Sequence, residues 1–175
     1  VELARATGYV GDDPYSGRLA GAATLGYAVA LALGLREGTW TPLRITVVAV
    51  LVFNVASIYG CLAEIGAGRA QPVVYLILAT SVAISLIALL LLARHSRGAV
   101  APDVAAWVLW VIAVATVLAT AFGFLPLLAP EVGRAFGFPV TDVFVYRQGG
   151  AATLGYAAMG VLQLRSRRWE EIRLS

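Results

Sequence analysis

Two arginines occupy equivalent places in the sequence and could bind an anion. Arg18 and Arg147 each precede a segment rich in glycine and alanine, and each follows an aspartate, Asp13 or Asp142, by five positions. The free N–H groups and the dipole at a helix N-terminus attract anions, and a guanidinium adds to that attraction. One interpretation is an anion or lipid-headgroup site. The other is an interfacial Asp–Arg pair that fixes how the helix enters a bilayer, and its occurrence twice favours this structural role.

A second group of polar residues, Asn54, Ser57, Tyr59 and Glu64, lies in one apolar segment. A carboxylate in the middle of a bilayer costs about 2.5–3.5 kcal/mol and would indicate a proton relay or a quinone site. Glu64 stands near the end of its segment, however, so we expect an interfacial acid close to Arg69. Asn54 and Ser57 are three residues apart on one helix face, and we expect interhelical hydrogen bonds there rather than substrate binding.

Several kinds of chemistry are excluded by the residues that the chain lacks. All 13 basic residues are arginine, which excludes a Schiff-base lysine. A single cysteine and a single histidine exclude an internal disulfide, a bis-histidine haem and a histidine-rich metal site within this chain. No P-loop, dinucleotide fingerprint, HExxH or nucleophile elbow is present. We therefore predict no catalytic residue, no metal and no cofactor, and this pattern favours a protein that is not an enzyme.

Composition indicates an integral membrane protein in contact with lipid. Hydrophobic residues make up 60% of the chain and charged residues only 13%, which leaves too little polar surface for a soluble domain. The apolar runs are long enough to cross a hydrocarbon core of about 30 Å. The net charge of +3 reflects arginines that flank these runs rather than a nucleic-acid site, because no basic stripe interleaves with aromatic residues.

The expected fold is all-α and polytopic, with five transmembrane helices. The spans are predicted at residues 19–35, 43–65, 72–93, 104–128 and 148–164. Residues 130–146 alternate aromatic and polar side chains, so we expect this segment to lie in the membrane interface. A basic tail begins at Arg165.

An internal repeat relates the two ends of the chain. The octapeptide at residues 21–28 returns at residues 150–157, and 19 of the 46 positions aligned by an offset of 129 are identical. A period of this length indicates duplication of a whole small domain. Four spans lie within the offset, so the copies should be parallel. Small residues let helices approach closely, and we predict helix packing at Ala22, Gly26, Ala30, Gly34, Ala151 and Gly155.

The repeat divides the chain into two unequal parts. Residues 1–129 form unit A, with three spans plus the first span of the next unit at 104–128, and residues 130–175 start unit B. The second copy has a span before its interfacial segment that has no counterpart before the first. We therefore expect the natural unit to have four helices, of which this sequence shows the last three of one copy and the start of the next.

Charge predicts the orientation. Five spans place eight arginines at one side of the membrane and five at the other. By the positive-inside rule the richer side, which includes the C-terminal tail, is cytoplasmic. The N-terminal segment and residues 130–146 are then outside, and we expect the chain in a bacterial cytoplasmic membrane.

One pattern resembles a known family. The run Leu125-Pro126-Leu127-Leu128-Ala129-Pro130, then Gly137-Phe138-Pro139, then Tyr146-Arg147-Gln148-Gly149-Gly150, is similar to that of the small DoxX-like four-helix membrane proteins. That group includes members tied to quinone-linked sulfur oxidation. No catalytic residue of the group maps onto a position here, so the resemblance informs the fold more than the activity.

Three functions follow from these observations. The first is a non-catalytic membrane scaffold or accessory subunit, which packs through small-residue stripes onto a larger membrane complex or a second copy. The second is a quinone-linked oxidoreductase subunit, which would need Glu64, Tyr59 or Arg18 to meet in one pocket. The third is a small-molecule transporter with parallel repeats. None involves nucleic acid.

Overall fold

The computed structural model describes residues 14–95, 104–137 and 140–175, and the regular secondary structure in this part of the chain is all helix. Some residues singled out from the sequence lie outside the described residues. They are Asp13, residues 96–103 of the linker predicted after the third span, Phe138 and Pro139. The described helices are α2 (Pro14–Glu37), α3 (Trp40–Gly66), α4 (Pro72–Arg94), α5 (Ala106–Leu128), α6 (Pro130–Ala135), α7 (Val143–Ser166) and α8 (Trp169–Ile172).

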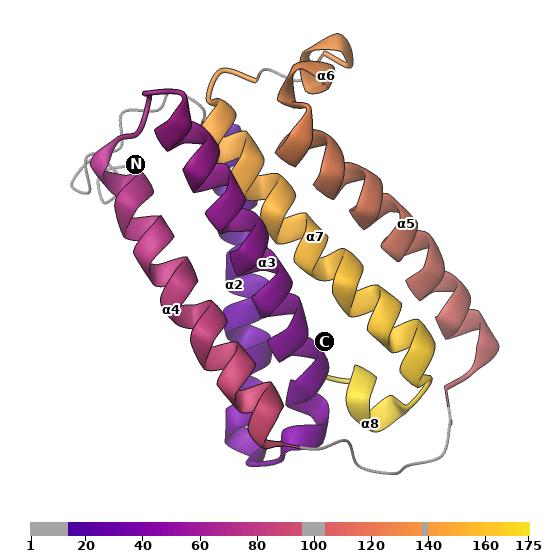
Figure 1. Cartoon of the computed structure of the whole chain (residues 1–175). Coiled ribbons are helices and arrows are strands. Elements are labelled where there is room, and N and C mark those ends of the chain that lie inside the picture. The colour runs from indigo at the N-terminus through magenta and orange to yellow at the C-terminus, as the bar shows by residue number, and fades with distance from the viewer. Residues whose placement is uncertain (1–13, 96–103, 138–139) are drawn as a thin grey trace.

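The long helices form a bundle in which α2, α4 and α7 run in one direction and α3 and α5 run back (Figure 1). Short connections join α2 to α3 and α3 to α4. Gly38 and Gly68 have φ values of 67° and 69°, a conformation that glycine adopts without steric cost. At the lower end in Figure 1, the Trp40 ring stacks on His95 with centroids 4.6 Å apart, which holds the start of α3 to the end of α4.

The core lies along α3 and α7, which pack against each other and against most of the remaining helices. One cluster joins α2, α3 and α7 through Tyr27, Ile45 and Ala152. A second joins α3, α5 and α7, where Ala151 and Leu154 pack against Leu127. α4 contacts mainly α3, and α5 contacts mainly α7, so these two helices flank the core on opposite sides.

Within the described residues, four helices are long and apolar enough to cross a membrane, namely α2, α3, α4 and α5. Leucine, isoleucine and valine on the outer faces of α4 and α5 are exposed, as are Trp107 and Trp110 near one end of α5. Contiguous apolar surface of this extent is expected in lipid rather than in water. These helices and this surface are consistent with an integral membrane protein. α7, with 24 residues, is about as long as these four helices, but it is more polar than they are and is not among the candidate spans.

Residues 130–146 differ from the single interfacial segment that the sequence predicted. Pro130 begins the short helix α6, but α7 already starts at Val143. The Asp142 side chain accepts a hydrogen bond from the Val145 N–H at 3.1 Å and caps that helix. Phe144 is consequently buried inside the bundle against Cys61 and Val74 rather than lying in the interface plane.

Candidate functional site

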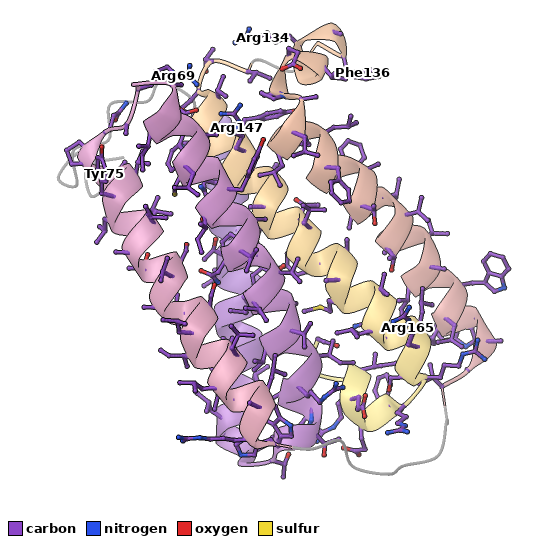
Figure 2. The ribbon with its side chains drawn as sticks, in the orientation of Figure 1. Arg69, Tyr75, Arg134, Phe136, Arg147 and Arg165 are labelled. Atoms are coloured by element: carbon purple, nitrogen blue, oxygen red, sulfur yellow. The ribbon has the colours of Figure 1, made fainter. Side chains whose placement is uncertain are left out.

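A buried carboxylate lies at the end of α3 and is bonded to two arginines. Glu64 is 4% exposed. It accepts hydrogen bonds from Arg69 at 2.9 and 3.0 Å and from Arg147 of α7 at 2.9 Å. Figure 2 shows both arginines at the upper end of the bundle, from separate elements. The sequence predicted an acid close to Arg69, whereas the contact with Arg147 joins α3 to α7 across 83 positions.

The two arginines differ in their surroundings. The Arg69 side chain is 56% exposed, and that of Arg147 is 15% exposed. The hydrogen bonds to Glu64 raise the pKa of Arg69. When folding raises the pKa of a basic group, its protonated form stabilises the folded state fully at any pH below the ordinary pKa. This stabilisation is lost only as the pH rises through the raised pKa. Arg69 therefore stays charged throughout the neutral pH range.

A chain of neutral polar side chains lies deeper in the bundle, on the same side of α3. The Ser57 hydroxyl donates to Gln148 Oε1 at 2.6 Å and accepts from the Ser81 hydroxyl at 3.2 Å. Gln148 Nε2 lies 3.3 Å from the Ser57 carbonyl oxygen and 3.7 Å from Cys61 Sγ. This network connects α3, α4 and α7, the interhelical role expected for Ser57.

Sequence reasoning missed Gln148 and Ser81. Gln148 directly follows Arg147, and the equivalent position of the first copy is Leu19, so the departure from the repeat was a usable signal. Ser81 follows Thr80 and stands four residues before Ser85, and this spacing of hydroxyl residues on one helix face was a usable signal. Asn54 is buried as expected, but its Nδ2 donates to the Val50 carbonyl of its own helix at 2.7 Å rather than across helices.

A cavity of about 390 Å³ opens beside this network, between α2, α3, α4 and α7. Its walls are largely apolar, and none of its lining residues is charged. The polar groups that reach it come from all four helices and are Thr24, Asn54, Ser57, Thr80, Ser81 and Gln148. An apolar pocket of this size with a few polar groups has the dimensions of a small-molecule site.

Tyr27 and Tyr156, which are equivalent in the repeat, form a reciprocal contact between α2 and α7. Their rings stack with centroids 4.5 Å apart. The Tyr27 hydroxyl donates to the Ala152 carbonyl at 2.6 Å, and the Tyr156 hydroxyl donates to the Ala23 carbonyl at 2.7 Å. Ala23 and Ala152 are themselves equivalent. Because each hydroxyl reaches four residues towards the N-terminus of the other helix, the two helices lie parallel and at the same height.

The predicted small-residue stripes are only partly in contact. A Cβ at Gly26 would meet the Tyr156 hydroxyl, and a Cβ at Gly155 would meet the Tyr27 hydroxyl and the Ala49 carbonyl. Gly34 packs against Leu43, and Ala151 is fully buried. Ala30 is half-buried, and Ala22 is exposed.

The remaining predicted residues do not converge with Glu64. Tyr59 is 45% exposed on α3. Arg18 is exposed and forms no ion pair within the described part of the chain. Asp142 caps α7, while its counterpart Asp13 is not described. The carboxylate that Arg147 contacts is that of Glu64.

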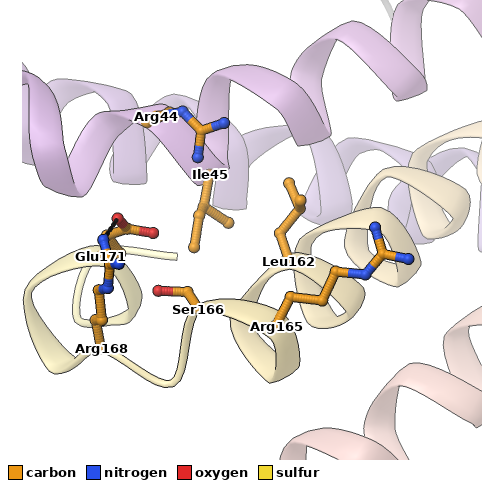
Figure 3. A pocket seen from close by; sticks show the side chains of 7 residues that line it. All are labelled: Arg44, Ile45, Leu162, Arg165, Ser166, Arg168 and Glu171. Carbon is orange, nitrogen blue, oxygen red and sulfur yellow. Dashed lines mark hydrogen bonds and ion pairs between the residues drawn. The ribbon is translucent and has the colours of Figure 1, made fainter. Parts of the chain in front are cut away.

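A smaller cavity of about 170 Å³ lies at the opposite end of the bundle (Figure 3). Arg44, Arg165 and Arg168 line it together with the buried Glu171. Arg168 donates to Glu171 at 3.1 Å, and the Arg165 guanidinium points away from that pair. Arg173, near the end of the chain, donates hydrogen bonds to Glu37 at 2.7 Å and to Glu170 at 3.0 Å. These hydrogen bonds raise the pKa of Arg173, and the contact with Glu37 ties the chain end to α2.

Comparisons with protein-family models, with curated proteins and with solved structures gave no match to this chain.

Proposed function

We propose that this chain is a non-catalytic scaffold or accessory subunit that packs, through α2, against a helix of a larger membrane complex. The outward face of α2 carries the proposal. Gly21, Ala22 and Ala28 are exposed there among exposed leucine and valine side chains, and Gly21 also lines the cavity described above. α4 contains no glycine, and Gly123 of α5 is buried. Small residues are typical of helix–helix contacts in membranes, because they allow backbones to approach closely. α2 therefore presents a docking face.

The polar side chains of the bundle are hydrogen-bonded within the protein, which supports a scaffold role rather than a catalytic one. Glu64 is bonded to two arginines, and Ser57, Ser81 and Gln148 are bonded to one another. A quinone-linked role needs Glu64, Tyr59 or Arg18 in one pocket, and the exposed positions of Tyr59 and Arg18 do not favour it. The likeness to DoxX-like proteins stays a proposal about the fold.

We extend the proposal to the arrangement in the membrane. α7 would be a fifth span, with its polar residues shielded from lipid by α2, α3 and α5, against which it packs. The parallel direction of α2 and α7 is consistent with tandem parallel four-helix units. The end of the bundle that holds Arg36, Arg94 and Arg165 would face the cytoplasm of a bacterial cell.

The uncharged cavity between α2, α3, α4 and α7 favours a second candidate, the binding or transport of a neutral amphipathic molecule. Hydroxyl and amide groups at Ser57, Ser81 and Gln148 would face its polar end, and Val73, Ile77 and Phe144 its apolar part. A neutral lipid or cofactor recovered by mass spectrometry from the purified protein, and lost in Ser81→Leu, would support this role.

Extraction from the native membrane in mild detergent tests the scaffold. We expect the chain of 18.4 kDa to run in a heavier assembly by native mass spectrometry. Ala28→Leu should disrupt the assembly, because a large side chain prevents close approach to the small face of α2. Ala83→Leu, at an exposed position on α4, is the matched control and should leave the assembly intact. A monomeric wild-type chain, or an assembly unaffected by Ala28→Leu, would refute the proposal.

A further inference from the structure

The repeated octapeptide has very different surroundings in its two occurrences. In α7, Leu154 is 8% exposed, whereas the equivalent Leu25 in α2 is 63% exposed. A Cβ at Gly150 would lie 2.7 Å from the Gly123 carbonyl oxygen, but a Cβ at Gly21 would have nothing within 4 Å. The same residues are therefore covered in one copy and open in the other.

α5 is the helix that covers them in α7. Leu154 lies over Gly123, where an added Cβ would approach the Leu154 side chain to 2.7 Å and its backbone N to 2.9 Å. Gly150 lies against the next turn of α5, with its hypothetical Cβ 3.0 Å from Pro126 Cβ and 2.9 Å from the Leu127 N. The octapeptide in α7 therefore packs against a helix that has glycine at position 123 and proline three residues later.

The contacts between α2 and α7 define where the equivalent helix would lie. Tyr27 bonds to Ala152 and Tyr156 to Ala23, and each tyrosine hydroxyl covers the glycine that precedes the other tyrosine. Contacts that are exchanged in this way have two-fold symmetry, here about an axis along the two parallel helices. The rotation that carries α7 onto α2 carries α5 onto Gly21 and Leu25 of α2, beside the cavity that Gly21 lines.

We propose, on the basis of the scaffold role, that the helix docked on α2 is of the α5 type, an apolar span with Gly-x-x-Pro-Leu near its extracytoplasmic end. The glycine accommodates Leu25, and the turn that contains the proline packs on Gly21. The copies differ at one position where α7 contacts α5. Gly160 of α7 contacts Thr116, but its equivalent in α2 is Leu31, a half-buried residue that packs against the α2–α3–α7 core. Leu31 is larger than Gly160, so the partner carries glycine or alanine where α5 has Thr116.

Photocrosslinking with a synthetic α5 peptide tests this partner. The full chain, with p-benzoylphenylalanine in place of Leu25, is reconstituted in phosphatidylcholine vesicles with a peptide of residues 104–130 that carries Thr116→Ala. We expect a crosslink between chain and peptide. A Gly123→Leu version of the peptide should crosslink about tenfold less, which corresponds to about 1.4 kcal/mol. The same photoreactive residue in place of Leu86, a leucine of α4 that is 57% exposed, is the matched control and should give only background.

Three outcomes would overturn the proposal. They are equal crosslinking at positions 25 and 86, equal crosslinking of the two peptides, and crosslinking of position 25 to a second copy of the chain in place of the peptide. The scaffold role has a separate readout, since it fails when the chain extracted from native membrane is monomeric. An assembly that is disrupted by Ala28→Leu but does not bind the peptide would leave the scaffold standing and refute the α5-type partner.

Discussion

Glu64 is the residue at which a single substitution should have the greatest effect. A buried carboxylate persists only where positive groups and hydrogen bonds replace its hydration. Arg147 supplies this from inside the bundle and Arg69 from the exposed loop. The sequence placed Glu64 near Arg69 because they are five positions apart, but the partner across the bundle depends on how α7 packs, which no local pattern encodes.

Replacing the two arginines in turn should separate these contributions. We expect Arg147→Met to lower the free energy of unfolding by about 3–5 kcal/mol, because it leaves a buried charge short of a partner. Arg69→Met should cost at most about 1 kcal/mol, since exposed ion pairs are weak. Unfolding in mixed micelles with increasing SDS, followed by tryptophan fluorescence, measures both. Glu64→Gln combined with Arg147→Met should recover part of the loss. Equal losses for the two single variants would contradict this assignment.

At the scale of helices, the parallel helices α2 and α7 approach each other at two equivalent glycines, Gly26 and Gly155. The surroundings of Gly155 are the more crowded. Next to Gly26 lies only the Tyr156 side chain, whereas Gly155 also faces the Ala49 carbonyl oxygen at 2.7 Å and Phe53 Cβ at 3.1 Å, measured from a hypothetical Cβ. The difference arises because α3 runs beside α7 at this height. An obstructing hydroxyl can be removed by substitution, but a backbone carbonyl cannot.

This difference predicts asymmetric rescue. Gly26→Ala and Gly155→Ala should both destabilise the protein, with Gly155→Ala costing about 1–3 kcal/mol as an overpacked site. Tyr156→Phe should restore most of the stability of Gly26→Ala, because it removes the obstructing hydroxyl. Tyr27→Phe should not rescue Gly155→Ala, because the Ala49 carbonyl remains. The same SDS titration measures all four, and rescue of both glycine variants would show that the Ala49 contact does not limit packing.

Helix positions were predicted well, and helix surroundings were not. Proline and glycine punctuation and runs of apolar residues located α3, α4 and α5 to within a few residues of their observed bounds. The sequence placed the start of the helix that contains Arg147 at Gln148, but α7 begins at Val143, because Asp142 caps it and Phe144 has a buried place against Cys61. Periodicity shows which residues can share a helix face, but it does not show which neighbour that face meets.

For the whole molecule, the alternating helix directions place the connections at two ends that differ in charge. The end that includes the α2–α3 turn and the C-terminal residues carries more of the arginines. The net excess predicts the orientation through the positive-inside rule. The four candidate spans followed from length and apolarity, whereas the polar network and the cavity depend on contacts between distant segments.

Labelling with a membrane-impermeant maleimide on intact cells tests the orientation. Ala67→Cys, in the α3–α4 connection, should react on intact cells. Thr39→Cys, in the α2–α3 turn, should react only after permeabilisation. Both positions are exposed, while the native Cys61 is fully buried, so the wild-type chain is the background control. The opposite pattern would reverse the orientation.

The crossed tyrosine hydrogen bonds also constrain how the protein is made. They join residues 125 and 133 positions apart, and ribosomes add about 5–20 residues per second. α2 therefore waits roughly 6–25 s in or near the translocation machinery before Ala152 and Tyr156 are synthesised. During that interval α2 can contact α3 but not α7, so it reaches its final place only after α7 has been synthesised.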